Sequence, residues 1–151
     1  MNVVYARRPL PGSIFLAGPT PRDKDTQSWR PEALRLLEKF GFAGTVYVPE
    51  DDFYREDFDY DSQVGWEIAA LNRSAAILFC VPRNGDLPGF TTNVEFGLFA
   101  SKLNVVLGYP EGAERMKYLH VQADRFGIPV HHTLPETILA AMKMAVEFKE
   151  R

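Results

Sequence analysis

Short apolar runs alternate along this chain with longer segments of helical periodicity, a pattern typical of βαβ units and a mostly parallel sheet. The runs at 13–17 and 75–81 are continuously apolar, as expected of strands buried on both faces. Pro129 places the last run at a sheet edge, because proline cannot donate to a neighbouring strand. The five predicted strands lie at 13–17, 45–48, 75–81, 105–108 and 128–131.

Five helices are predicted to follow these strands. Ser28 is the expected N-cap of the first, and Thr91 or Thr92 that of the third. The apolar spacing predicts that Leu34, Leu36 and Leu37 of the first helix face the sheet. The same spacing predicts a buried stripe in the last helix, made of Ile138, Leu139, Met142, Val146 and Phe148. The helices lie at about 28–40, 61–73, 92–102, 113–126 and 134–149. The prediction is an α/β fold: one domain over residues 1–151, with a doubly wound, mostly parallel five-stranded sheet and helices on both faces, flavodoxin-like or Rossmann-like.

Composition narrows the class of protein. The 151 residues are 46% hydrophobic and 25% charged, which is ordinary for a globular chain. The net charge is −3 with basic residues scattered, so a nucleic-acid partner is not expected. One cysteine, Cys80, and three histidines without ligand spacing predict no disulfide and no metal site. No run approaches the roughly 20 apolar residues that span a bilayer, and the N-terminus lacks a secretory apolar region, so we expect a cytoplasmic protein without a membrane partner.

A doubly wound sheet binds ligands beyond the carboxyl ends of its strands. Three loops lie there in the predicted fold, and they hold most of the unusual residues of the sequence. The loops are 18–22, 49–60 and 82–93.

Two carboxylates adjoin these loops. Glu95 is predicted in the first turn of its helix, where the helix dipole favours an ionised carboxylate; the alternative is a capping box with Thr92. No other ionisable residue lies between Thr92 and Ser101, so that helix is expected to be buried. Burial of a carboxylate costs free energy, and its presence there therefore favours a functional role. Glu67 precedes the third strand and could face the same crevice; the alternative is a solvated helix face. Paired carboxylates are the usual machinery for cleaving a glycosidic bond.

Other residues of these loops could bind a ligand. Gly18 and Pro19 follow the first strand, and Arg22 could add a cation for an anion; the alternative is a tight turn with a solvated arginine. The segment fits neither a Walker loop nor a dinucleotide-binding fingerprint. Trp66 and Phe90 adjoin the carboxylates and could stack on a flat base; the alternative is that both are packing residues.

Several segments together resemble the nucleoside 2-deoxyribosyltransferase superfamily, in particular its small bacterial members. They cover about residues 13–110 in the same order, and the segment around Glu95 is the most specific. The segments are Ile14-Phe15-Leu16-Ala17-Gly18-Pro19, Tyr60-Asp61-x-Gln63-x-x-Trp66-Glu67, Ser74 to Phe79, Pro88 to Gly97 and Lys102 to Gly108.

The resemblance implies that Glu95 is a nucleophile that attacks the anomeric carbon of a nucleoside and releases the base. It also implies that Glu67 protonates the departing base, although family members more often carry aspartate in both roles and at the position of Ala75. Thr91, Thr92 and Asn93 replace the family's polar groups that hold the sugar, and Arg22 is similar in place to an arginine that some relatives use on a 5′-phosphate. No cofactor is implied; the implied partners are a nucleoside or nucleotide, a free nucleobase, and further copies of the chain that share active sites.

Residues 88–95 are also similar to the phosphate-binding motif of nucleoside-monophosphate phosphoribohydrolases, one residue shorter and without two of its glycines. Four hypotheses therefore stay open. They are a sugar transferase, an N-glycosidase that uses water as acceptor, a non-catalytic nucleotide sensor, and an interaction module that uses the acidic, aromatic segment 51–60.

Overall fold

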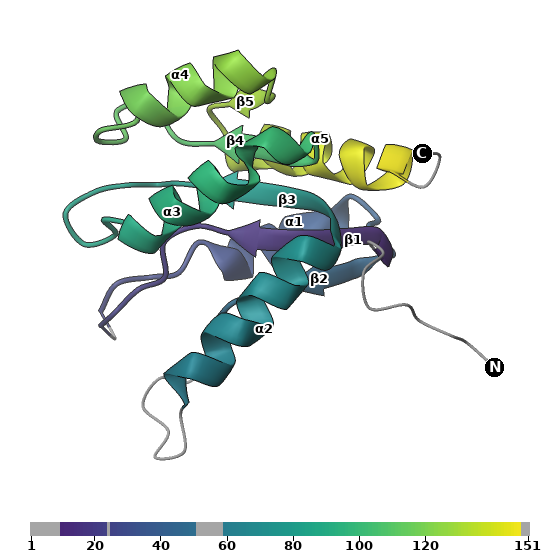
Figure 1. The fold of residues 1–151 in the computed structure, drawn as a ribbon, viewed down its shortest axis with the longest axis horizontal. Coiled ribbons are helices and arrows are strands. Elements are labelled where there is room, and N and C mark those ends of the chain that lie inside the picture. The colour runs from purple at the N-terminus through teal and green to yellow at the C-terminus, as the bar shows by residue number, and fades with distance from the viewer. Residues whose placement is uncertain (1–9, 24, 51–58, 149–151) are drawn as a thin grey trace.

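The computed structural model describes residues 10–23, 25–50 and 59–148. The predicted segment 51–60 therefore lies almost wholly outside the described residues. The elements run in the order predicted (Figure 1): β1 (Leu10–Ala17), α1 (Arg30–Lys39), β2 (Thr45–Tyr47), α2 (Tyr60–Arg73), β3 (Ser74–Cys80), α3 (Phe90–Phe99), the 3-10 helix η1 (Ala100–Lys102), β4 (Val105–Gly108), α4 (Lys117–Phe126), β5 (Val130–His131) and α5 (Leu134–Glu147).

The sheet has five parallel strands in the order β2-β1-β3-β4-β5, which confirms the predicted α/β class. Ile14 of β1 pairs with Val46 on one side and with Ala76 on the other. This is the flavodoxin-like strand order, and its connections reverse direction between β1 and β3. The carboxyl ends of these two strands are the expected place for a ligand.

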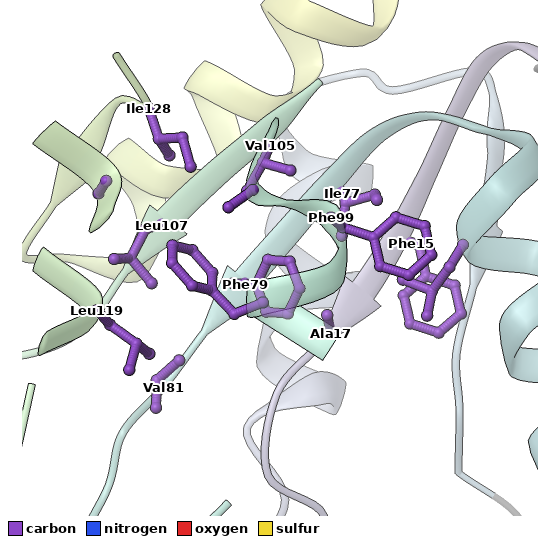
Figure 2. Close-up of a cluster of buried hydrophobic side chains, with 14 of the residues drawn as sticks. Phe15, Ala17, Ile77, Phe79, Val81, Phe99, Val105, Leu107, Leu119 and Ile128 are labelled. Atoms are coloured by element: carbon purple, nitrogen blue, oxygen red, sulfur yellow. The ribbon is translucent and has the colours of Figure 1, made fainter. Parts of the chain in front are cut away.

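Two apolar clusters cover the two faces of the sheet. Figure 2 shows part of one cluster, in which Phe15, Phe79 and Leu107 from the strands meet Phe99 and Leu119 from the helical layer. On the opposite face Ile14, Leu16 and Leu78 pack against α1 and α5. Helices α2, α3 and α4 therefore cover one face, and α1 and α5 cover the other, as Figure 1 shows. Within the described part of the chain, no helix is both long and apolar enough to cross a bilayer.

Several predicted helix details are wrong. The N-cap of α1 is Trp29 rather than Ser28, although the Ser28 hydroxyl still accepts a hydrogen bond from the Arg30 N–H at 3.1 Å. Leu34 is 40% exposed, while Leu36 and Leu37 are buried as predicted. In α5 the buried face consists of Thr137, Ile138, Ala141 and Ala145, so Leu139 and Val146 point outward. Small side chains let α5 lie close to the strands, and apolarity alone did not reveal that.

The start of α3 corrects the predicted setting of Glu95. The N-cap is Gly89 in the left-handed conformation, with φ of 63°, rather than Thr91 or Thr92. Glu95 is therefore the sixth helical residue, in the second turn, and no capping box with Thr92 forms. Helix α4 starts at Lys117 instead of 113, because Gly112 and Arg115 take positive φ angles that no helix contains.

Candidate active site

Glu95 lies on the flank of a helix that aromatic packing fixes to the sheet. Its neighbour Phe96 makes an edge-to-face contact with Phe79 of β3, with ring centroids 5.2 Å apart. Thr92 and Phe96 are buried beneath the helix, while Val94 and Leu98 are more than 60% exposed on its outer side. The helix is thus only half buried, contrary to the expectation from its low charge. Glu95 is partly buried between these two sides.

Glu67 is positioned in the same way on α2. Its neighbour Trp66 packs against Phe15 of β1 and Tyr47 of β2, with ring centroids 6.4 and 6.2 Å apart. Gln63, one turn earlier, donates a hydrogen bond from Nε2 to Glu67 Oε1 at 2.7 Å. Burial raises the pKa of Glu67, and the Gln63 hydrogen bond and the charge of Arg30 oppose that rise. Glu67 is therefore an oriented, partly desolvated carboxyl group and not a solvated one.

The two carboxyl groups are electrostatically coupled. Burial raises the pKa of Glu95 to about 7; the charge of Glu67 adds to the rise and that of Arg30 opposes it. Each additional negative charge in this crevice is therefore resisted, and the pair retains one proton up to about neutral pH. The larger rise is that of Glu95, so Glu95 holds this proton in the larger part of the population. Nucleophilic attack by Glu95 with acid assistance from Glu67 requires the other form of the pair, in which Glu67 holds the proton.

Arg30 is the site residue that the sequence reasoning missed. It is the first residue of α1 and only 1% exposed. Its Nε donates to Leu16 O at 3.0 Å and its Nη2 to Gly18 O at 2.8 Å. One guanidinium group thus binds two backbone carbonyl oxygens at the end of β1. Its Nη1 forms an ion pair with Glu50 Oε1 at 2.6 Å. A basic residue in a helix's first turn opposes the helix dipole, and that unfavourable placement was the signal available in the sequence.

The turn after β1 is closely packed against β3. A Cβ atom on Gly18 would lie 2.1 Å from the Cys80 carbonyl oxygen, and its φ of 151° is one that side chains rarely allow. The Trp29 indole donates to Pro19 O at 3.2 Å, and the Pro19 ring lies beside Gly89. Gly18 and Pro19 therefore lie packed between the ends of β1 and β3 and the start of α3. Arg22 is exposed beyond them.

The remaining predicted residues divide between two sides of α3. Thr91 is exposed and Thr92 is buried. Phe90 and Asn93 line a cavity that faces α4, and neither Glu95 nor Glu67 lines that cavity. The structure thus brings Glu95 and Glu67 together with Arg30, and it does not bring Phe90 and Asn93 to them.

Cys80 is not a nucleophile in this setting. It is buried at the end of β3, and burial raises the pKa of its thiol to about 12. A thiol that stays protonated at neutral pH is unreactive. Among the described residues, no group of three or more His, Cys, Asp or Glu side chains is placed to hold a metal ion.

Comparison with known protein families matches residues 11–113 to the family described as nucleoside 2-deoxyribosyltransferase like. The chain belongs to this family. The matched segment contains Arg30, Glu67 and Glu95 together with the strands that carry their loops, so the deoxyribosyltransferase-like region and the carboxylate crevice coincide. A search of curated proteins finds no match to the chain.

The fold of this deoxyribosyltransferase-like chain is similar to part of a solved structure, a variant of the flavo di-iron protein from Thermotoga maritima. The two share 14% sequence identity with a TM-score of 0.54, over 93% of this chain and 37% of the other. The chain thus spans little more than a third of that protein. The likeness shows a flavodoxin-like fold and nothing about activity.

Proposed function

We propose that this protein cleaves the N-glycosidic bond of a nucleoside and transfers the sugar to a second nucleobase. The observation that carries the proposal is the coupled pair of Glu95 and Glu67, which holds one proton near neutral pH. Its place at the reversal point between β1 and β3 adds support, as does family membership over the same segment.

In the first step a carboxylate oxygen of Glu95 attacks the anomeric carbon and forms an ester bond to the sugar. The bond from that carbon to the base nitrogen breaks, and its electron pair leaves with the base. The carboxyl group of Glu67 gives its proton to the departing base and becomes a carboxylate. The step is redox-neutral and moves one proton.

In the second step a ring nitrogen of the acceptor base attacks the same carbon. The ester bond to Glu95 breaks, the Glu95 carboxylate is restored, and the proton lost by the acceptor nitrogen returns to Glu67. The pair thus ends with the one proton it held at the start. The step uses only groups of this chain and its substrates, so the proposal needs no cofactor.

Arg30 acts as a positioning residue. Its guanidinium is held by Leu16 O, Gly18 O and Glu50, so it cannot swing into the crevice without breaking these bonds. Its positive charge lowers the pKa of both carboxyl groups. The charge thereby keeps part of the Glu95 population ionised, which is the form that attacks.

Hydrolysis is the second candidate, because side chains beside the carboxylate pair are exposed to solvent. Trp66 is 44% exposed beside Glu67, and Thr91 is exposed beside the start of α3. Water could reach a glycosyl ester there unless a base or a second copy of the chain covers it. The exposed apolar side chains Val94 and Leu98 on α3 are compatible with the homo-oligomer that the family resemblance implies.

A chromatographic assay tests the proposal. Wild type and Glu95→Ala are incubated with deoxynucleosides, ribonucleosides and their monophosphates, with and without a free acceptor base. Transfer predicts a new nucleoside that forms only with the acceptor and only in the wild type. Glu111→Ala, which removes an exposed carboxylate far along the chain, is the matched control and should retain activity. Free base and sugar without exchange would establish hydrolysis, and no cleavage of any substrate would overturn the proposal.

A further inference from the structure

A second cavity lies on the opposite flank of α3 from Glu95. Its volume is about 530 Å³, within the range of small-molecule sites. It is lined by the loop after β3, by α3 and by the start of α4, and on α3 the lining residues include Phe90, Asn93 and Gly97. Successive helical residues differ by about 100°, so Glu95 lies roughly 200° around the helix from Asn93. The two sites therefore open on different sides.

A buried arginine faces this cavity, and no carboxylate among the described residues forms an ion pair with it. Arg83 follows β3 and is 7% exposed. Its Nη2 donates to Asn93 Oδ1, and its Nη1 makes a long contact of 3.4 Å with the Arg115 carbonyl oxygen. Its Nε is buried and has no hydrogen-bond partner among the residues that the structure describes. That Nε is closed to a ligand, but each terminal nitrogen carries two N–H groups and uses one of them. An anion in the cavity would accept from the remaining N–H groups of Nη1 and Nη2.

A second cation faces the same space. Arg115 lines the cavity with an exposed side chain and a positive φ of 54°, unusual for a residue other than glycine. Burial of Arg83 lowers its pKa and the charge of Arg115 lowers it further, so the two guanidinium groups repel each other. Glu114 also lines the cavity, and its backbone N–H donates to Arg83 O at 3.2 Å. Within the described part of the chain, neither arginine forms an ion pair with it.

Two aromatic rings border the same cavity. Phe90 at the start of α3 is 71% exposed and Tyr118 in the first turn of α4 is 72% exposed. Exposed aromatic rings on both walls of a small cavity suit a flat ring system, and neighbouring guanidinium groups suit a phosphate. We propose that this cavity binds a nucleoside monophosphate, with its phosphate on Arg83 and Arg115 and its base between Phe90 and Tyr118, at a site separate from Glu95.

The test measures binding by calorimetry, using the full chain as Glu95→Gln so that no probe is cleaved. The probes are adenosine and cytidine 5′-monophosphates, the two nucleosides, ribose 5-phosphate and inorganic phosphate. The monophosphates should bind more tightly than any of the others, and Arg115→Ala should weaken them at least tenfold. Arg125→Ala removes an exposed arginine of α4 that does not line the cavity, and it should leave the affinity unchanged.

The outcomes separate this proposal from the proposed function. Binding that Arg115→Ala leaves unchanged, or that Glu67→Gln abolishes, would place the nucleotide in the carboxylate crevice and overturn the second site. Equal affinity for inorganic phosphate would show that the cavity binds anions in general, and it would overturn the proposal that it recognises a nucleotide. No binding of any probe would overturn the proposal whatever the activity of the wild type.

Discussion

The charge of Glu67 on α2 adds to the burial that raises the pKa of Glu95 on α3 to about 7. The two carboxyl groups therefore titrate as a pair, with a lower step in the acid range and an upper step near neutrality. Between these steps the pair carries one proton and one negative charge. Arg30 lowers the pKa of both groups from the other side of β1, and without it the upper step would move to higher pH.

The first prediction is a bell-shaped pH dependence of kcat/KM. Activity falls at low pH because both carboxyl groups are protonated, and it falls above about pH 7 because the pair has lost its last proton. Glu67→Gln should remove the coupling and shift the Glu95 titration to lower pH. Rates measured from pH 4 to 9 check this, and a profile that rises steadily through pH 7 to 9 would be incompatible with it.

The second prediction concerns stability. The pKa of Glu95 is about 7 in the folded protein, against an ordinary value of 4.5, so the folded state binds more protons between these values. Ionisation of Glu95 therefore lowers the free energy of unfolding of the protein as pH rises from about 4.5 to 7. Glu95→Gln removes that loss and should raise the free energy of unfolding at pH 8 by on the order of 1–3 kcal/mol, with a smaller gain at pH 5. Urea unfolding at both pH values measures it, with Glu111→Gln as a control that changes neither; equal effects at both would contradict the assigned burial.

The third prediction tests the Arg30–Glu50 ion pair. Arg30 is 1% exposed, and Glu50→Ala would remove the carboxylate that forms an ion pair with its guanidinium. Loss of one partner of a buried pair costs about 3–5 kcal/mol. Glu32→Ala breaks the ion pair with Arg35, in which both side chains are at least half exposed, and should lower the free energy of unfolding far less than Glu50→Ala. Chemical unfolding of both variants gives the comparison, and similar losses would show that Arg30 finds another partner.

The fourth prediction compares two glycines. Gly18→Ala would place a methyl group against the Cys80 carbonyl oxygen at a strained φ, so β1 and β3 would have to separate at the edge that carries the site. Gly65→Ala lies in open space within α2, where alanine is the better helix former by about 1 kcal/mol. We expect Gly18→Ala to lower the melting temperature strongly and Gly65→Ala to raise it. A tolerated Gly18→Ala would show that this turn adapts more readily than its packing indicates.

Apolar periodicity was sufficient to predict the sheet, because a strand buried on both faces is a continuous apolar run. The segment predicted at 75–81 corresponds to β3, every residue of which is buried. Helix starts were less predictable. Glycine in a left-handed conformation begins α3, whereas the sequence favoured the threonines, whose hydroxyl groups are better caps in general. That shift moved Glu95 from the first helical turn to the second.

Glu95 could be selected from the sequence because no other ionisable residue lies between Thr92 and Ser101, and Glu67 because it precedes the third strand and could face the same crevice. Arg30 was not selected, although its unfavourable place at a helix start was visible in the sequence, because its burial depends on carbonyl groups that the chain brings together only on folding. Phe90 and Asn93 were placed beside Glu95 by their closeness in sequence. On a helix, residues two apart point to opposite sides. In the structure Asn93 lines the other cavity, where it accepts a hydrogen bond from Arg83.

The most direct test of the account is the mass of the protein during turnover. Wild type is mixed with a 2′-deoxynucleoside without acceptor, quenched rapidly in acid and analysed by intact and peptide mass spectrometry. We predict a gain of one deoxyribosyl group, located on the peptide at Glu95, absent from Glu95→Gln and retained in Glu111→Gln. An adduct on another residue, or release of base with no adduct at any quench time, would contradict the assignment of Glu95 as the nucleophile.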